Sequence, residues 1–428
     1  MKKEVGKNPG INRWIPVFGG IAIQLCLGTA YIWGVFQPEV VQVLNWSQKE
    51  AALTFSLLLG VLTFGSMVGG RIQDKLSPRP VLIIGGLILA LGFFLASMAT
   101  PANPWILWVT YGIIGGFGMG TTYTTTIAVC QKWFPDKRGM ITGIIVSALG
   151  FGGLVFTPVA NALIERTGVL NAFAWFALIF AVVTVVCGGL FIKNPPADYW
   201  PEGVPRPQSK PGAAPAASFS PGQVLRKPQF YLVTFTLMLA SAAGLMVIPF
   251  AKILGLEAGL SDVVATAGVM VIAIFNSFGR LFWGWVSDKI GRQNTLLLLL
   301  VIAATSILFV AAAQSWVVLV LIALVGFSYG GFLGVFPALT ADLWGVRHLG
   351  VNYGLVLLGF GIGAIASSYA AGYFLDLSGG FTVPFIIAAS AAAAGALLVY
   401  IMKLSLRRSA QDYSRKLQAV KTAAEPAE

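Results

Sequence analysis

Charged side chains are scarce in this chain. Of its 428 residues only 10% are Asp, Glu, Lys or Arg, whereas 57% are hydrophobic. A typical soluble domain carries roughly 25% charged residues, so the composition excludes an ordinary water-soluble domain. A bilayer core of about 30 Å needs about 20 apolar residues for each helix that crosses it. We therefore expect an all-α membrane protein.

Histidine and cysteine are also rare, with one and three residues in the whole chain. We expect the single histidine, His348, in a loop, and no His, Cys or acidic residues recur at the spacing of metal ligands. The sequence therefore predicts no metal site, no cofactor and no catalytic residues, and we do not expect an enzyme. Cys26, Cys130 and Cys187 fall in apolar stretches, where thiols behave as small buried hydrophobic groups rather than as a disulfide framework.

Apolar runs between charged or Pro/Gly breaks predict twelve membrane-spanning helices, six on each side of a polar stretch. In the first half we expect these helices at residues 14–37, 51–70, 80–100, 104–131, 140–164 and 170–192. In the second half we expect them at residues 229–256, 262–286, 294–313, 316–341, 349–375 and 382–404.

The polar stretch is rich in Pro, Ala and Ser, which is typical of a solvated linker. It divides the chain into two parts of similar length. We therefore predict an N-terminal six-helix bundle at residues 1–194, a cytoplasmic linker at 195–228, a C-terminal six-helix bundle at 229–406 and a cytoplasmic tail at 407–428.

The net charge of +12 is distributed unevenly between the two sides of the predicted bundle. The side opposite the two termini holds only Lys49, Arg166 and Lys252, as the positive-inside rule predicts when both termini are cytoplasmic. Topology therefore accounts for the positive charge, which argues against binding to nucleic acid. We expect a monomeric, multi-pass protein of a cell membrane, such as a bacterial inner membrane, with its basic tail on anionic lipid headgroups.

The two halves carry similar loops at equivalent positions. Residues 70–75, Gly-Arg-Ile-Gln-Asp-Lys, follow the second predicted helix, and residues 284–292, Gly-Trp-Val-Ser-Asp-Lys-Ile-Gly-Arg, follow the eighth. Their charged residues can pair across one membrane surface in one conformation and separate in another; alternatively, they only set topology and cap helix ends. The candidate gating residues are Asp74, Lys75, Asp288, Lys289 and Arg292.

A Gly-x-x-x-Asp-Lys/Arg-x-Gly-Arg loop in each of two six-helix halves resembles the signature of the major facilitator superfamily. The resemblance covers the whole chain and implies twelve transmembrane helices in two pseudo-symmetric bundles with a substrate site between them. The first half departs from the signature, since Ser77 and Pro78 stand where the second half has Gly291 and Arg292.

Arg280 is the one basic residue that we cannot assign to a loop or tail. Burying a guanidinium in the hydrocarbon region costs several kcal/mol unless it faces water, a partner or a ligand. The acidic residues of the sequence are predicted near the two membrane surfaces and not at its depth. We therefore predict that Arg280 binds a small organic anion through two parallel hydrogen bonds; the alternative is a permanent pair with a protein carboxylate.

Residues 275–284, Phe-Asn-Ser-Phe-Gly-Arg-Leu-Phe-Trp-Gly, and 133–139, Trp-Phe-Pro-Asp-Lys-Arg-Gly, resemble the oxalate/formate antiporter family, whose relatives include the monocarboxylate transporters. In that family this arginine binds the substrate carboxylate, which implies the same role for Arg280. The oxalate exchanger has a second cation, a lysine, where this chain has Phe360, so the resemblance favours a monoanion here. Animal monocarboxylate transporters have an aspartate at the position of Asn276, and their handling of the proton therefore does not transfer.

Other polar and aromatic residues of the predicted helices complete the candidate site. Asn276 lies one turn before Arg280 and offers an amide to the ligand or to a neighbouring helix. The aromatic residues either line the cavity or pack in the core, and a buried tyrosine hydroxyl needs a partner. The set comprises Asn276, Tyr31, Tyr123, Tyr329, Phe332, Phe336 and Phe360.

These features predict a secondary transporter of small monocarboxylates, such as lactate, that works by alternating access. An anion entering against an inside-negative potential needs compensating charge, about 2.3 kcal/mol per charge per 100 mV, which favours symport with a proton. Glu257 and Asp376 are the candidate proton carriers or, alternatively, interfacial anchors. An anion exchanger of the oxalate/formate type, a non-transporting receptor or scaffold, and a passive channel remain as alternatives.

Overall fold

The computed structural model describes residues 12–196, 199–201, 204, 218–310, 312–378 and 380–423. This part of the chain is almost entirely helical and contains no strand. The N-terminal half comprises α1 (Ile15–Leu27), η1 (Gly28–Ile32), α2 (Trp33–Leu44), α3 (Gln48–Lys75), α4 (Pro78–Ala96), η2 (Trp108–Gly115), α5 (Gly116–Trp133), α6 (Arg138–Thr167), α7 (Val169–Val186) and η3 (Cys187–Phe191). The C-terminal half comprises α8 (Pro221–Leu225), α9 (Pro228–Leu245), η4 (Ile248–Phe250), α10 (Ala251–Glu257), α11 (Asp262–Ile290), α12 (Arg292–Val310), α13 (Val317–Trp344), α14 (Leu349–Ser378) and α15 (Thr382–Ala423).

Eleven of the twelve predicted spans correspond to helices in the described part that are long and apolar enough to cross a membrane. The remaining predicted span, the fourth in chain order at 104–131, corresponds to η2 and α5. Five threonines at positions 121, 122 and 124–126 lower the hydropathy of α5. Almost every residue of α5 is buried, so this helix faces protein rather than lipid and needs no apolar surface.

Local sequence signals account for several helix ends. Ser47 and Glu50 form a capping box at the start of α3, in which the Ser47 hydroxyl accepts from the Glu50 N–H at 3.2 Å. Proline occupies the first turn of α4 and α9, where the missing N–H is harmless. Gly291, with a φ of 87°, ends α11 in a backbone conformation that other residues adopt only with strain.

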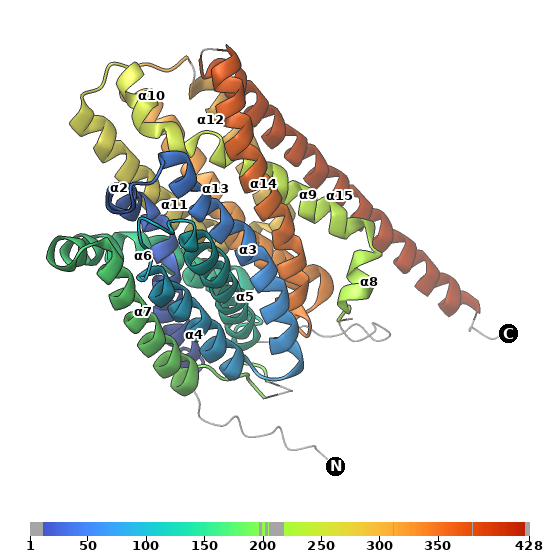
Figure 1. Cartoon of the computed structure of the whole chain (residues 1–428). Coiled ribbons are helices and arrows are strands. Elements are labelled where there is room, and N and C mark those ends of the chain that lie inside the picture. The colour runs from blue at the N-terminus through green and yellow to red at the C-terminus, as the bar shows by residue number, and fades with distance from the viewer. Residues whose placement is uncertain are drawn as a thin grey trace.

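Two helix pairs make most of the contact between the halves. In each pair a helix of the N-terminal half packs along a helix of the C-terminal half: α3 against α14, and α6 against α11 (Figure 1). We call the end of the molecule with the α3–α4, α5–α6, α11–α12 and α13–α14 connections the loop end, and the opposite end the far end.

Glycines bring the paired helices into backbone contact at the loop end. A Cβ on Gly350 of α14 would lie 2.8 Å from the Cα of Gly70 in α3. A Cβ on Gly284 of α11 would lie 3.0 Å from the Cα of Gly143 in α6. Because no side chain fits between these backbones, the two halves are tightly closed against each other at this end.

The last part of the predicted linker is packed on the C-terminal half. The Phe219 N–H donates to the Trp344 carbonyl at 3.0 Å, and the Asn352 amide donates to the Phe219 carbonyl at 3.1 Å. Lys227 lies over the Phe219 ring at 4.0 Å. Residues 218–225 therefore lie against the end of α13 and the start of α14, and they do not run free in solvent.

Candidate functional site

Arg280 lies deep inside the molecule, well within α11, with 1% of its surface exposed. Its side chain donates four hydrogen bonds to neutral oxygens. Nε and Nη2 donate to Asn276 Oδ1 at 3.2 and 3.1 Å, Nη1 donates to the Val146 carbonyl at 3.0 Å, and Nη2 donates to the Tyr31 hydroxyl at 3.2 Å. None of the ion pairs within the described residues involves Arg280. Each guanidinium nitrogen thus has a hydrogen-bond partner, with four of the five N–H donors used, but the positive charge is not neutralised by these partners.

The Val146 carbonyl belongs to α6 and the Tyr31 hydroxyl to η1, so the N-terminal half contributes two of the partners of a C-terminal arginine. The sequence predicted Asn276 and Tyr31 as members of this site but gave no sign of Val146. A backbone acceptor can come from any residue type, and only the packing of α6 on α11 identifies it.

Glycines of α13 and α6 fix the position of the α11 backbone around Arg280. A Cβ on Gly330 would overlap the Asn276 carbonyl, and a Cβ on Gly334 would overlap the Arg280 carbonyl. On the opposite side, a Cβ on Gly143 would lie 2.6 Å from that same carbonyl. These three positions were not predicted as functional, although the glycine-rich run of α13 was a usable signal for close helix packing.

A cavity of about 530 Å³ lies between the two halves and extends from Arg280 toward the far end. Helices of both halves contribute to its wall. Arg280 is the only charged residue among the described lining residues. Of the predicted site residues, the cavity is lined by Arg280, Asn276, Tyr31, Tyr329 and Phe360.

Three predicted site residues do not line this cavity: Tyr123, Phe332 and Phe336 are all buried elsewhere in the core. The Tyr123 hydroxyl lies 3.5 Å from the hydroxyl of Tyr353 in α14, so this pair joins the two halves. Phe332 and Phe336 lie on α13, which is buried on all sides from Ser328 to Ala341.

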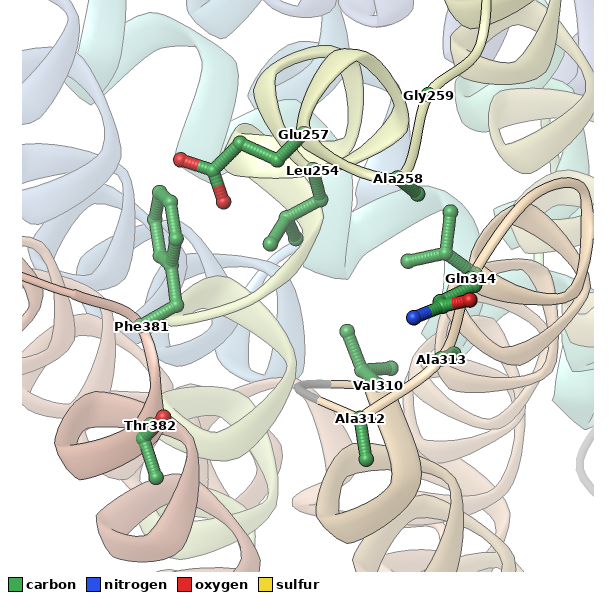
Figure 2. Close-up of a pocket in the computed structure, with 11 residues that line it drawn as sticks. Leu254, Glu257, Ala258, Gly259, Val310, Ala312, Ala313, Gln314, Phe381 and Thr382 are labelled. Carbon is green, nitrogen blue, oxygen red and sulfur yellow. The ribbon is translucent and has the colours of Figure 1, made fainter.

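Glu257, one of the two predicted proton carriers, does not line the central cavity with Arg280. Glu257 is exposed at the end of α10 and lines a separate cavity of about 590 Å³. Figure 2 shows its carboxylate together with Phe381 and Gln314 around that space. Asp376 lies in α14, and its side chain is outside the described residues.

The single histidine is at the loop end, between α13 and α14, as expected. Partial burial and the nearby positive charges of Arg347 and Lys132 lower the pKa of His348. Its imidazole is therefore neutral near pH 7. His348 does not line the central cavity.

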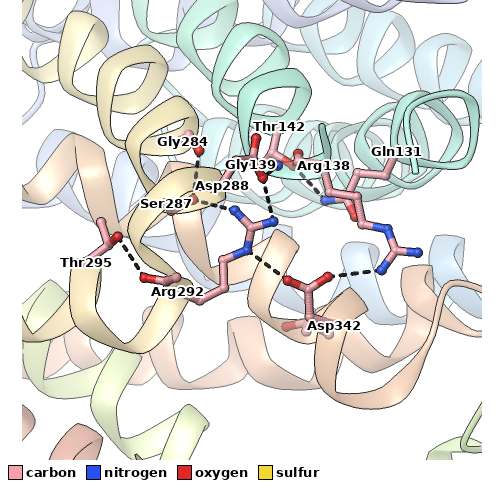
Figure 3. Close-up of polar contacts among 12 residues, drawn as sticks. Gln131, Arg138, Gly139, Thr142, Gly284, Ser287, Asp288, Arg292, Thr295 and Asp342 are labelled. Carbon is pink, nitrogen blue, oxygen red and sulfur yellow. Dashed lines mark hydrogen bonds and ion pairs between the residues drawn. The ribbon is translucent and has the colours of Figure 1, made fainter. Parts of the chain in front are cut away.

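The signature aspartate of the second half joins the two halves at the loop end. Asp288 accepts hydrogen bonds from the N–H groups of Gly139 and Met140, in the first turn of α6, at 3.0 and 2.7 Å. Arg292 pairs with Asp288 at 2.6 Å and with Asp342 at 2.8 Å. Arg138 of α6 pairs with the other oxygen of Asp342 at 3.0 Å (Figure 3). We call this network, formed by Asp288, Arg292, Asp342, Arg138 and the first turn of α6, the C-half lock.

The signature aspartate of the first half makes a smaller set of contacts. Asp74 accepts a hydrogen bond from the N–H of Val351, in the first turn of α14, at 3.2 Å. Its other oxygen accepts from the Gln73 amide at 2.7 Å. Asp74 forms none of the ion pairs within the described residues. We call this arrangement the N-half lock.

The two predicted gating lysines take no part in these locks. Lys75 is exposed at the end of α3. Lys289 extends over the ring of Trp285, with its Nζ 3.7 Å from the ring centre. Such a cation–π contact at an exposed position contributes about 0.5–1 kcal/mol.

Known proteins resemble this chain along most of its length. The sequence model of the Major Facilitator Superfamily matches residues 18–303 and 269–425. An uncharacterized MFS-type transporter of Escherichia coli, YhjX, is 32% identical over 357 residues, which cover 82% of this chain and 86% of YhjX. The oxalate:formate antiporter of Oxalobacter formigenes is 28% identical over 86% of this chain and 88% of its own. Monocarboxylate transporter 13 of Rattus norvegicus is 27% identical over 87% of this chain and 84% of its own.

Solved structures show the same fold. The fucose:proton symporter FucP of Escherichia coli matches with a TM-score of 0.70 and 16% identity, covering 92% of this chain and 99% of FucP. A second structure of FucP, in the outward conformation, matches with a TM-score of 0.69.

Proposed function

This chain belongs to the Major Facilitator Superfamily and is a multi-pass membrane transporter, and from its central cavity we propose that it carries small monocarboxylates, lactate among them. The observation that carries the proposal is the state of Arg280. Its guanidinium is buried, lines the cavity and has only neutral oxygens as hydrogen-bond partners. A carboxylate is a stronger acceptor than an amide or a hydroxyl because the hydrogen bond is charge-assisted. A substrate anion can therefore replace Asn276 or Tyr31 at the guanidinium.

The number of charges in the cavity supports a substrate with one carboxylate. Arg280 is the only charged residue among the described lining residues, and Phe360, the position where the resemblance to the oxalate/formate antiporter family implies a lysine, also lines the cavity. A second carboxylate in this site would be desolvated without a counter-charge, at a cost of several kcal/mol. The curated relatives include both an oxalate:formate antiporter and a monocarboxylate transporter, and the single charge in the described lining favours the chemistry of the second.

We propose that the cavity serves alternating access between the two six-helix bundles. The far end is open to the cavity, and the loop end is closed by the two locks and the glycine contacts. Asp74, Asp288 and Arg292 would act as gating residues, because their partners lie in the opposite half or on helices that pack on it. Rotation of one bundle against the other would break both locks and expose Arg280 at the loop end.

Proton symport is the coupling mode that we propose, with the termini and the loop end on the cytoplasmic side of a bacterial inner membrane and the protein active as a monomer. Glu257 and Asp376 stay the candidate proton carriers. An anion exchanger is the second candidate, and one observation favours it: the described lining of the central cavity contains no carboxylate or histidine.

Uptake into proteoliposomes tests both parts of the proposal. With the wild-type protein, a pH gradient should drive uptake of labelled lactate into vesicles that contain no internal anion, whereas a pure exchanger requires internal anion. Arg280→Ala should abolish saturable uptake, and Arg280→Lys should retain a fraction of it, because a lysine keeps the charge but loses the planar pair of donors. Arg166→Ala, at an exposed position of α6, is the matched control for loss of an arginine. Unchanged uptake by a folded Arg280→Ala protein would refute the site.

A further inference from the structure

The central cavity is much larger than a three-carbon acid requires. Its volume of about 530 Å³ lies within the range of about 300–1,000 Å³ that is usual for sites of drug-sized ligands. Lactate or acetate displaces only a few water molecules of about 30 Å³ each. A small acid held at Arg280 would leave most of the cavity to water.

Apolar side chains form most of the cavity wall. Arg280 and Asn276 form its anion-binding part together with the Tyr31 hydroxyl. The remaining wall is mainly aliphatic and aromatic, with contributions from α3, α6, α9, α11 and α14. Typical members of this apolar wall are Phe55, Leu59, Leu154, Leu245, Met270 and Phe360.

Water is a poor occupant of a space with such a wall. Water molecules in a protein cavity are stabilised by two to four polar partners each. Apart from Tyr31, Asn276, Ser277, Arg280 and Tyr329, the described lining offers only the Thr157 side chain, whose hydroxyl already donates to the Gly153 carbonyl. A hydrocarbon group that displaces this water gains about 0.8 kcal/mol per buried methylene, which is about a fourfold gain in affinity. Met270 has an unbranched, flexible side chain that can adapt to groups of different shape.

We infer that, among the monocarboxylates this site accepts, the ones it binds most tightly carry an apolar substituent of about four or more carbons, as a chain, a branched chain or an aromatic ring. The inference rests on the proposed function, since it places the carboxylate at Arg280. The hydrocarbon group then extends toward the far end along Leu59 and Met270. Formate, acetate and oxalate are poor ligands of this site, because they leave the apolar wall wet.

Binding of a homologous series measures the apolar part of the site directly. Purified protein is titrated with straight-chain saturated acids from acetate to octanoate near pH 7, where all are ionised, and affinity is taken from the ligand-dependent shift of thermal unfolding. We expect a two- to fourfold gain in affinity for each added methylene up to about six carbons, and no such gain with the alcohols of the same length. A flat series, or a series in which acetate binds best, would overturn the inference.

Arg280→Ala separates this inference from the proposed function. If the variant loses binding of short and long acids alike while wild-type affinity does not depend on chain length, the carboxylate site stands and the apolar class is wrong. If wild type binds no acid of any length, or Arg280→Ala binds all of them as wild type does, the proposed function itself is wrong.

A wall substitution tests the position of the hydrocarbon group. Leu59→Asn, in the middle of α3, should weaken hexanoate about tenfold and acetate less than twofold. Leu53→Asn, on the same helix but exposed and not lining the cavity, is the matched control and should change neither. Size-exclusion profiles verify that both variants fold. Equal weakening of hexanoate and acetate by Leu59→Asn would overturn the proposed placement.

Discussion

The C-half lock and the N-half lock occupy equivalent places at the loop end but hold it closed by different means. In both, an aspartate at the end of one helix accepts N–H groups from the first turn of a helix in the other half. Such a carboxylate also interacts favourably with the positive end of the helix dipole. Only Asp288 is in addition part of a chain of ion pairs, through Arg292, Asp342 and Arg138.

One sequence difference explains the asymmetry. Arg292 lies four residues after Asp288 and reaches both Asp288 and Asp342, whereas the equivalent position in the first half is Pro78. Proline starts α4 well but has no charge to offer. The element that the two locks share is therefore the capped helix N-terminus, and the ion pairs are an addition in one half.

Removing the charge of Asp288 should have the largest effect. Asp288→Asn weakens two hydrogen bonds to the first turn of α6 and one ion pair. The change destabilises the closed loop end by about 2–3 kcal/mol. We expect at least a tenfold fall in transport rate. Spin labels at the exposed positions Lys137 and Lys289, in opposite halves, should move apart in electron–electron distance measurements. An unchanged distance would show that the glycine contacts alone hold this end.

Removing the charge of Asp74 should have a smaller effect. Asp74→Asn weakens one bond to the first turn of α14 and no ion pair in the described part of the chain, a loss of about 1 kcal/mol. We expect a three- to fivefold fall in transport rate and a smaller change between the same two labels. If Asp74→Asn is as damaging as Asp288→Asn, the ion pairs of the C-half lock add nothing to the closure of the loop end.

Removing Asp342 tests the ion pairs by themselves. Asp342→Asn breaks both of its pairs but leaves the bonds between Asp288 and α6 intact. The Asp342 side chain is 38% exposed, so we expect an effect of at most about 1 kcal/mol. The change in transport rate, about two- to threefold, should disappear near 1 M salt, where the Debye length is about 3 Å. A salt-independent defect would mean that Asp342 acts in another way.

Giving the N-half lock the Gly-Arg sequence of the second half should have the smallest effect. Pro78→Arg, combined with Ser77→Gly, offers Asp74 a partner at the spacing of Asp288 and Arg292. A partly exposed pair of this kind contributes about 0–1 kcal/mol, so we expect a rise of no more than a few degrees in unfolding temperature and transport slowed by twofold or less. A gain in transport rate would contradict the view that this lock stabilises one of the two alternating states.

Hydropathy and charge placement were sufficient to predict the helices of this fold. Each span needs a long apolar run, and the breaks between runs were visible as charges, Pro or Gly. The ends were less accurate: the first span was predicted to stop at residue 37, but its helix continues past Pro38 to Leu44. A proline inside a membrane helix is tolerated because neighbouring helices compensate for the lost hydrogen bond.

The sequence predicted those members of the candidate site whose own chemistry is unusual for their position in an apolar helix. Arg280 was conspicuous because a charge in an apolar run needs an explanation. The face of α13 that meets the cavity was not predictable, since residues from Ser328 to Ala341 are all buried and hydropathy shows no contrast around that part of the helix. In the structure Tyr329 lines the cavity, whereas Phe332 and Phe336, which were predicted with it, do not. Arg138 and Asp342 were missed as partners because they are far apart in sequence and meet only when the halves pack.

Both locks join a side chain of one half to main-chain amides of the other, and this has a genetic consequence. A single codon change can remove Asp74 or Asp288, but almost no change at Met140 or Val351 removes the amide that each aspartate holds, because every residue except proline supplies one. Inherited loss of either lock therefore falls on one side of each contact. Second-site suppressors of a lost aspartate should arise as new acidic residues that reach the same helix N-terminus, and not as changes in the helix that it caps.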